Sequence, residues 1–216
     1  MARKSYDQYC GLARALDVIG ERWTLLIVRN LFLGPRRYSD LMDELPGITT
    51  NLLAKRLAEM TKQGLVTKRT SAPPYSATVY ELTNEGATLE PAVHALGAWG
   101  GRFMGAVRRA DTKNLGWALF ALKRRYQGGV TGSIGLVSEQ RRYTLRLGNV
   151  TMAVRDDDTG PVDATVTADS VTLREAFIGG DADARGRLVI EGKKAVVTRA
   201  FRAFSAPQYR GSTGPP

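Results

Sequence analysis

The chain has 216 residues, which is enough for one large domain or two small ones that each bury a core. Its 43% hydrophobic and 24% charged residues are typical of a globular protein and exclude a disordered one. The net charge of +10 favours a polyanionic partner such as nucleic acid. Residues 1–110 carry 15 Lys and Arg against 10 Asp and Glu, and residues 111–216 carry 16 against 11, so charge alone does not say which half touches DNA.

Several classes of protein are disfavoured by what the sequence contains. The chain has one cysteine, which excludes an internal disulfide and indicates a reducing compartment. It also has only one histidine, and so few possible ligands argue against a zinc site. No set of nucleophile, base and orienting residue suggests an enzyme, so we expect no catalytic residues, no cofactor and no metal. No apolar run approaches the ~18 residues of a membrane span, and the N-terminus lacks a secretory apolar segment, so a cytoplasmic protein without a membrane partner is expected.

The first expected elements are two helices. Residues 10–19 place Leu12, Leu16 and Ile19 on one face, and Gly20 ends that helix. Residues 23–33 are apolar nearly all round, which predicts a buried central helix that stops at Gly34-Pro35.

A helix-turn-helix is predicted next. Residues 37–45 form a short helix that ends at Leu45-Pro46-Gly47. Thr49 is a natural N-cap for a second helix, whose inward face carries Ile48, Leu53, Leu57 and Met60. Two helices joined by a tight turn, the second beginning with small polar residues, are typical of a helix-turn-helix.

A β-hairpin and a long helix follow. Residues 65–70 and 77–82 are β-branched runs around a proline-bearing tip, which completes a winged helix. A helix is then expected from Thr83 towards Arg109. Its apolar stripe is too long for a small winged core, so we assign it to dimerisation; the alternative is packing against the C-terminal half. The stripe comprises Leu89, Val93, Leu96, Trp99 and Phe103.

The fold class expected is α+β in two domains. Residues 1–110 form the winged helix-turn-helix domain with its dimerisation helices, residues 111–205 an α+β domain, and residues 206–216 a flexible tail. The second domain should contain helices at 115–126, 169–178 and 195–204, a last strand at 186–192, and a meander sheet that the helices cover.

The N-terminal motifs resemble the HxlR family of bacterial winged-helix regulators over residues ~8–104. They are Cys10, the run Leu16 to Trp23, Gly34 to Leu41, Leu45-Pro46-Gly47-Ile48, Leu53 to Leu57, Gly64-Leu65-Val66 and Tyr80 to Thr83. The resemblance implies a dimeric transcription factor whose terminal helices form the dimer. The C-terminal half resembles a sterol-carrier-protein-like domain by pattern, which implies an apolar cavity.

Candidate DNA contacts lie on the second helix, before the first helix of the pair and on the wing. Asparagine can pair with adenine, threonine can touch the thymine methyl, and cations reach guanine or phosphate. The candidates are Arg36, Arg37, Thr49, Thr50, Asn51, Lys55, Lys68, Arg69 and Tyr75. The alternative for each is a solvated surface residue. Cys10 stands where redox-sensing members of the family carry their cysteine; burial as a small hydrophobe is the alternative.

An apolar effector is expected in the second domain, between helices and sheet, because its helices carry more large apolar side chains than one sheet face needs. The candidate lining residues are Trp117, Phe120, Leu173 and Phe177; the alternative is that they fill the core. The function predicted is a homodimeric regulator that binds double-stranded palindromic DNA and an apolar effector. The alternative function is a lipid or small-molecule carrier with a residual DNA-binding domain. The presence of Asn51 and Lys55 together with the basic pair Arg36-Arg37 favours the regulator over this alternative.

Overall fold

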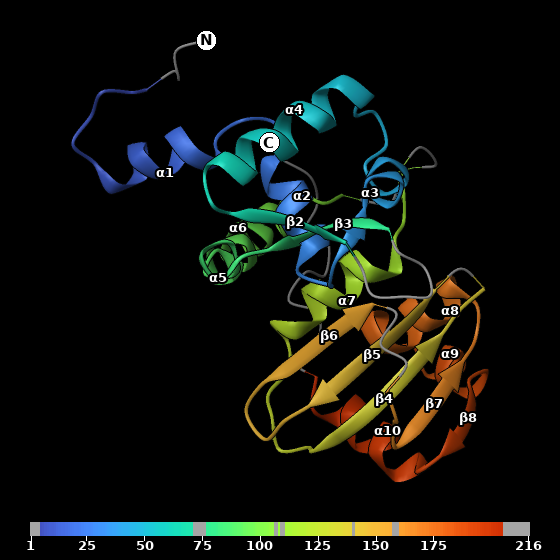
Figure 1. Cartoon of the computed structure of the whole chain (residues 1–216). Coiled ribbons are helices and arrows are strands. Elements are labelled where there is room, and N and C mark those ends of the chain that lie inside the picture. Colours follow the sequence, from blue (N-terminus) through green and yellow to red (C-terminus); the bar gives the residue numbers. More distant parts are fainter. Residues whose placement is uncertain are drawn as a thin grey trace. The chain divides into compact units, whose positions relative to one another are not determined.

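The computed structural model describes residues 5–70, 77–105, 108, 111–139, 141–156 and 160–204. The chain divides into two compact units, Met1–Val93 and His94–Pro216 (Figure 1). The division falls inside the segment expected to be one long helix. The domain boundary near residue 110 and the flexible tail therefore stay predictions.

The first unit begins with helices that match the predicted ones to within two residues at each end. They are α1 (Gly11–Ile19), α2 (Thr24–Leu31), α3 (Tyr38–Glu44) and α4 (Thr50–Lys62). The core between them contains Ile27, Val28, Leu41, Leu53 and Leu57, which are at most 1% exposed. Each such side chain stabilises the fold by roughly 1.5–3 kcal/mol through burial of apolar surface.

The helix starts are fixed by local hydrogen bonds. The Thr49 hydroxyl accepts a hydrogen bond from the Leu52 amide at 3.4 Å, which satisfies one of the free N–H groups at the start of α4. At the start of α3, the Arg37 amide donates to Asp40 Oδ2 at 2.9 Å. The predicted cap of α4 is confirmed, and Arg37 is the N-cap residue of α3.

The wing is a three-stranded sheet in the order β1-β3-β2. The hairpin strands β2 (Val66–Thr70) and β3 (Thr78–Leu82) pair antiparallel, with Lys68 opposite Tyr80, as the two β-branched runs predicted. The short strand β1 (Arg36–Arg37) pairs with β3 and was not predicted. Two residues are too few to show a period of two in the sequence.

The single helix expected after the wing is two helices in the structure. They are α5 (Asn84–Ala87) and α6 (Glu90–Gly101), and the second ends well before Arg109. Pro91 explains the break, because a proline ring clashes with the carbonyl four residues earlier, here that of Ala87. Proline is tolerated in the first turn of α6, where it stands.

The second unit combines one sheet with helices, in the order α7, β4, β5, β6, β7, α8, η1, α9, β8, α10. The helices are α7 (Leu115–Lys123), α8 (Ser170–Arg174), the π-helix η1 (Glu175–Gly179), α9 (Ala182–Gly186) and α10 (Lys194–Arg202). The strands are β4 (Gly132–Val137), β5 (Arg142–Leu147), β6 (Met152–Asp156), β7 (Ala164–Thr167) and β8 (Val189–Gly192). The strand predicted over 186–192 begins only at Val189, and α9 ends at Gly186.

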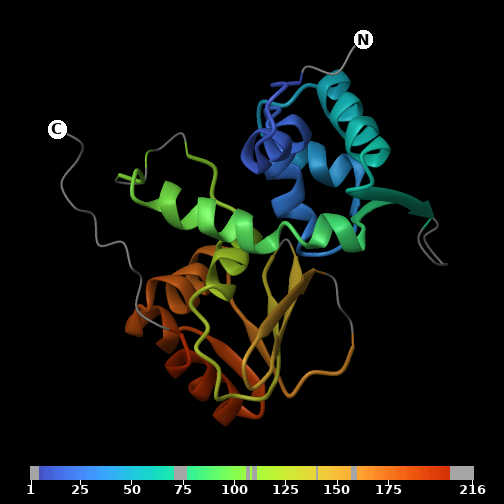
Figure 2. The same ribbon diagram turned by 90° about the vertical axis from the view of Figure 1, so that its left-hand side faces the viewer.

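The five-stranded sheet has the order β6-β5-β4-β7-β8, and β4 pairs with β7 in parallel. The prediction of a meander is therefore right for β4 to β6 and wrong for β7, which crosses over to the other side of β4. The helices lie on one face of this sheet (Figure 2). Side chains of that face, such as Ile134, Leu136 and Leu145, are fully buried.

Candidate nucleic-acid interface

The outer face of α4 carries three of the predicted DNA contacts. Thr50, Asn51 and Lys55 are all exposed, while Leu53 and Leu57 on the opposite face are buried. Lys55 Nζ lies 4.0 Å from Glu59 Oε1, a loose pair on the surface that costs little to break. The first two turns of α4 therefore expose these three side chains on one side of the helix.

The inner face of α4 is anchored by an arginine that the sequence analysis missed. Arg56 is buried, and its guanidinium donates to Glu21 Oε2 at 2.5 Å, to the Arg22 carbonyl at 3.2 Å and to Glu59. These bonds join α4 to the turn before α2 and fix its rotation about its own axis. An arginine in a helical pattern reads as a surface cation, so the sequence held no signal of this role.

A second anchor joins the two helices of the pair. The Tyr38 hydroxyl, at the start of α3, donates to the Thr50 carbonyl at 2.6 Å. This bond sets the distance between the N-terminal ends of α3 and α4. The sequence shows a tyrosine before a helix but does not say which carbonyl it reaches.

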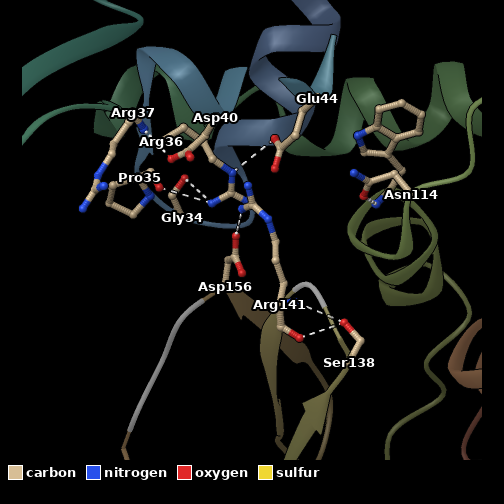
Figure 3. A network of polar contacts seen from close by, with 11 residues as sticks. Gly34, Pro35, Arg36, Arg37, Asp40, Glu44, Asn114, Ser138, Arg141 and Asp156 are labelled. Carbon is tan, nitrogen blue, oxygen red and sulfur yellow. Dashed lines mark hydrogen bonds and ion pairs between the residues drawn. The ribbon is translucent and has the colours of Figure 1, made fainter. Parts of the chain in front are cut away.

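Arg36 and Arg37 were both expected to clamp phosphates, and the structure separates them. Figure 3 shows Arg36 turned towards Glu44 and the carbonyls of Gly34 and Pro35, and Arg37 turned away from them. Arg36 is 2% exposed, and its Nε lies 3.3 Å from Glu44 Oε2. A buried guanidinium that neutralises a buried carboxylate is not available to a phosphate, so the expectation for Arg36 was wrong. Arg37 is exposed.

The wing carries Lys68 and Arg69 on β2, both exposed. Arg69 Nε donates to Glu81 Oε1 across the hairpin at 2.7 Å, which partly neutralises its charge. Lys68 is the stronger candidate of the two for a phosphate contact. Tyr75 lies outside the described residues.

Cys10 is exposed at the N-cap of α1. The backbone N–H groups of Ala13 and Leu12, at the free end of the helix, hold the pKa of its thiol below the ordinary value. The alternative of a buried hydrophobe is wrong for this side chain. Exposure and a lowered pKa are two properties that a redox-sensing thiol needs, although its redox role stays a prediction.

The predicted dimerisation stripe is largely exposed. Leu96, Trp99 and Phe103 are 49%, 59% and 68% exposed, and the rings of Trp99 and Phe103 meet edge to face at 4.8 Å. Leu89 and Val93 are half-buried.

The predicted effector residues lie mainly in the interior of the second unit. Phe120, Leu173 and Phe177 are at most 5% exposed, and Trp117 is half-buried. A surface cavity beside α10 is not lined by any of these four side chains. Effector binding at these residues therefore stays a prediction.

In the described residues no group of three or more histidine, cysteine or acidic side chains is placed to hold a metal ion. No helix among them is long and apolar enough to cross a membrane.

The arrangement of α3, α4 and the hairpin defines a winged helix-turn-helix protein. Residues 18–108 match the family described as HxlR-like helix-turn-helix. The helix-turn-helix-type transcriptional regulator YkvN of Bacillus subtilis is 34% identical over 96 residues, which cover 44% of this chain and 80% of the relative. The regulator sll1512 of Synechocystis is 32% identical over 92 residues, or 41% of this chain and 68% of the relative. The chain belongs to the HxlR-like family.

Among solved structures, the reduced form of the transcriptional regulator YodB from B. subtilis is 26% identical with a TM-score of 0.40. It covers 47% of this chain and 100% of its own. The residues beyond 108 lie outside the family match, so the resemblance of the second unit to a sterol-carrier-like domain stays a prediction.

Proposed function

We propose that this protein is a sequence-specific DNA-binding regulator that places the N-terminal turns of α4 in the major groove. The observation that supports the proposal is that one face of α4 is packed against the protein, whereas the other face is exposed to solvent. Arg56 and the buried leucines hold one side, while Thr50, Asn51 and Lys55 are exposed on the other. The major groove of B-DNA admits one α-helix, and its base edges lie within reach of such side chains.

Each exposed group has a distinct partner in this arrangement. The Asn51 amide pairs with the N6 and N7 atoms of adenine, and the Thr50 methyl contacts a thymine methyl. Lys55, one turn further on, reaches guanine or a phosphate. Arg37 and Lys68 flank α4 from the start of α3 and from the wing, where cations meet the sugar-phosphate backbone. Base contacts would supply specificity, and backbone contacts would supply most of the affinity.

We further propose that the regulator acts as a homodimer through α6. Four large apolar side chains on α6 and just after it are exposed: Leu96, Trp99, Phe103 and Met104. Large apolar side chains exposed close together, as the contacting rings of Trp99 and Phe103 are, are typical of a protein interface. A two-fold dimer matches the palindromic operators that helix-turn-helix proteins read.

Selection of bound duplexes from a random DNA pool tests the proposal. The purified full chain should enrich an inverted repeat with adenine and thymine at defined positions. The Asn51→Ala variant, run in parallel, should lose preference at one position of each half-site. A pool that stays random after several rounds would contradict sequence-specific binding, whatever the affinity for bulk DNA.

A further inference from the structure

A shallow surface cavity of about 250 Å³, wide open to solvent, lies in the second unit, where the end of α10 passes the loop after α7. Its lining residues are Gly128, Gly129, Val130, Arg199, Arg202 and Ala203. It is separate from the interior between helices and sheet where the apolar effector was expected. It also lies outside the residues that the family match covers.

The wall of the cavity is held by several hydrogen bonds. The Gln127 amide donates to the Ala203 carbonyl at 2.8 Å, and the Tyr126 hydroxyl donates to the Val130 carbonyl at 2.6 Å. The loop is thereby pinned to the last turn of α10 on one side and closes on itself on the other. A wall held in this way is preformed, so a ligand would pay little ordering cost on binding.

Two glycines keep the mouth of the cavity open. Gly128 and Gly129 have φ angles of +81° and +77°, which side chains rarely adopt. A Cβ at Gly128 would lie 2.3 Å from the Asn149 carbonyl oxygen, whereas nothing lies within 4 Å of the Cβ position at Gly129. The open space at Gly129 adjoins the two arginines.

The charge of the cavity is positive and uncompensated. Arg199 and Arg202 are exposed, three residues apart near the end of α10, where the helix dipole favours cations. Within the described part of the chain, neither guanidinium takes part in a hydrogen bond or an ion pair. Residues 193–204 hold four Lys and Arg and no Asp or Glu, and residues 127–131 also lack acids. The dipole explains cations at this helix end but does not explain why two of them line the same cavity.

We propose that this cavity binds the phosphate or carboxylate group of a small anionic molecule. Two guanidinium groups would hold the anion with charge-assisted, bidentate hydrogen bonds, which also relieves the repulsion between cations three residues apart. Val130 and Ala203, both buried, offer an apolar contact for a few carbon atoms. The volume lies just below the range of ~300–1,000 Å³ for drug-sized ligands, so the ligand is small.

Inorganic phosphate is a suitable probe, at constant ionic strength against sodium chloride. Phosphate should raise the melting temperature of the full chain in a saturable way. The double variant Arg199→Gln, Arg202→Gln should bind phosphate at least tenfold more weakly. The matched control is Lys194→Gln, an exposed cation of the same helix outside the cavity, which should bind phosphate like the wild type. Acetate in place of phosphate separates a carboxylate site from a phosphate site.

A second measurement needs no variant. Phenylglyoxal modifies exposed arginines, and phosphate should slow modification of Arg199 and Arg202 while it leaves Arg37 unaffected, as read by peptide mass spectrometry. The proposal is overturned if phosphate gives no more stabilisation than chloride, or if the double variant keeps the full effect. It is also overturned if the double variant binds phosphate normally but lowers the salt dependence of DNA binding, since the arginines would then be backbone contacts.

Discussion

Asn51 stands at the exposed start of α4 with no protein group between its amide and solvent on that face. We expect Asn51→Ala to cost about 1–3 kcal/mol of affinity for the selected operator, because a bidentate pair with adenine is lost. Affinity for unrelated DNA should hardly change. Gln63→Ala removes the same amide from the other end of α4 and serves as the control. Equal operator affinity of Asn51→Ala and wild type, in binding isotherms, would refute the assignment.

Arg37, unlike the buried Arg36, can contact a DNA phosphate. Its guanidinium is exposed, so Arg37→Ala should weaken binding to all sequences alike and lower the slope of log K against log [salt] by about 1. Isotherms between 50 and 300 mM salt, at about five concentrations, measure that slope. Lys62→Ala removes an exposed cation from the far end of α4 and should leave the slope unchanged. An unchanged slope in Arg37→Ala would remove this residue from the backbone contacts.

The position of Cys10 at the N-cap of α1 predicts that its thiol is more reactive than an ordinary thiol. Because the N–H groups of Ala13 and Leu12 favour the thiolate, its pKa lies below the ordinary thiol value, and more thiolate is present at a given pH. The rate of alkylation by iodoacetamide, plotted against pH, should therefore reach half its maximum at a lower pH than in the same protein unfolded in urea. Unfolding removes the helix and provides the reference. Identical profiles in the two states would show that α1 does not activate the thiol.

At the scale of elements, the sequence predicted those that carry a strong period or a clear cap. The helices α1 to α4 and both wing strands belong to this group, and Thr49 caps α4 as expected. The helix predicted over 169–178 is α8 followed directly by η1. Pairings between segments that are distant in the sequence were not predicted. The strand β1 exists because Arg36 lies opposite Tyr80, and β7 is parallel because it pairs with β4.

The same distinction separates the candidate site residues. Exposure of Thr50, Asn51 and Lys55 follows from helical period, so the sequence placed them correctly on the outer face of α4. Burial of Arg36 depends on a carboxylate eight residues away, Glu44, and burial of Arg56 depends on Glu21, 35 residues away. Charged residues are rarely buried unless paired, and a sequence does not show the pairing. Arg36 was therefore misassigned for a physical reason rather than for lack of a motif.

The helix α6 is the element on which the proposed assembly depends. Trp99→Ala removes a large apolar side chain that is 59% exposed in the single chain, so it should weaken the dimer by about 2 kcal/mol or more and DNA binding with it. Val150→Ala, at a residue that is 78% exposed between β5 and β6, is the control and should leave the dimer intact. Sedimentation at micromolar concentration measures both. A wild-type chain that sediments as a monomer would exclude this interface.

At the scale of the whole molecule, the two units pose different problems for inference. The first unit belongs to a family whose described relatives are transcriptional regulators, so its α4 and wing can be read against a known mode of DNA binding. The residues of the second unit beyond 108 lie outside that family match, and Arg199 and Arg202 among them were not singled out by the sequence. The cavity beside α10 is formed by a loop and a helix that are distant in the sequence: its lining residues Gly129 and Arg199 are 70 residues apart. No local sequence pattern predicts that these two segments lie close together.

A dimeric regulator makes a prediction about the DNA itself. If two copies of α4 are held by one two-fold interface, both half-sites must lie on the same face of the duplex, about one helical turn of 10–10.5 base pairs apart. Five extra base pairs between the half-sites turn one of them to the opposite face, so operator affinity should fall to that of a single half-site. Ten extra base pairs restore the face but not the distance, so recovery should be partial at most. Mobility shifts on the three duplexes test this, with two chains per operator as the expected stoichiometry; equal affinity for all three would mean that each chain binds alone.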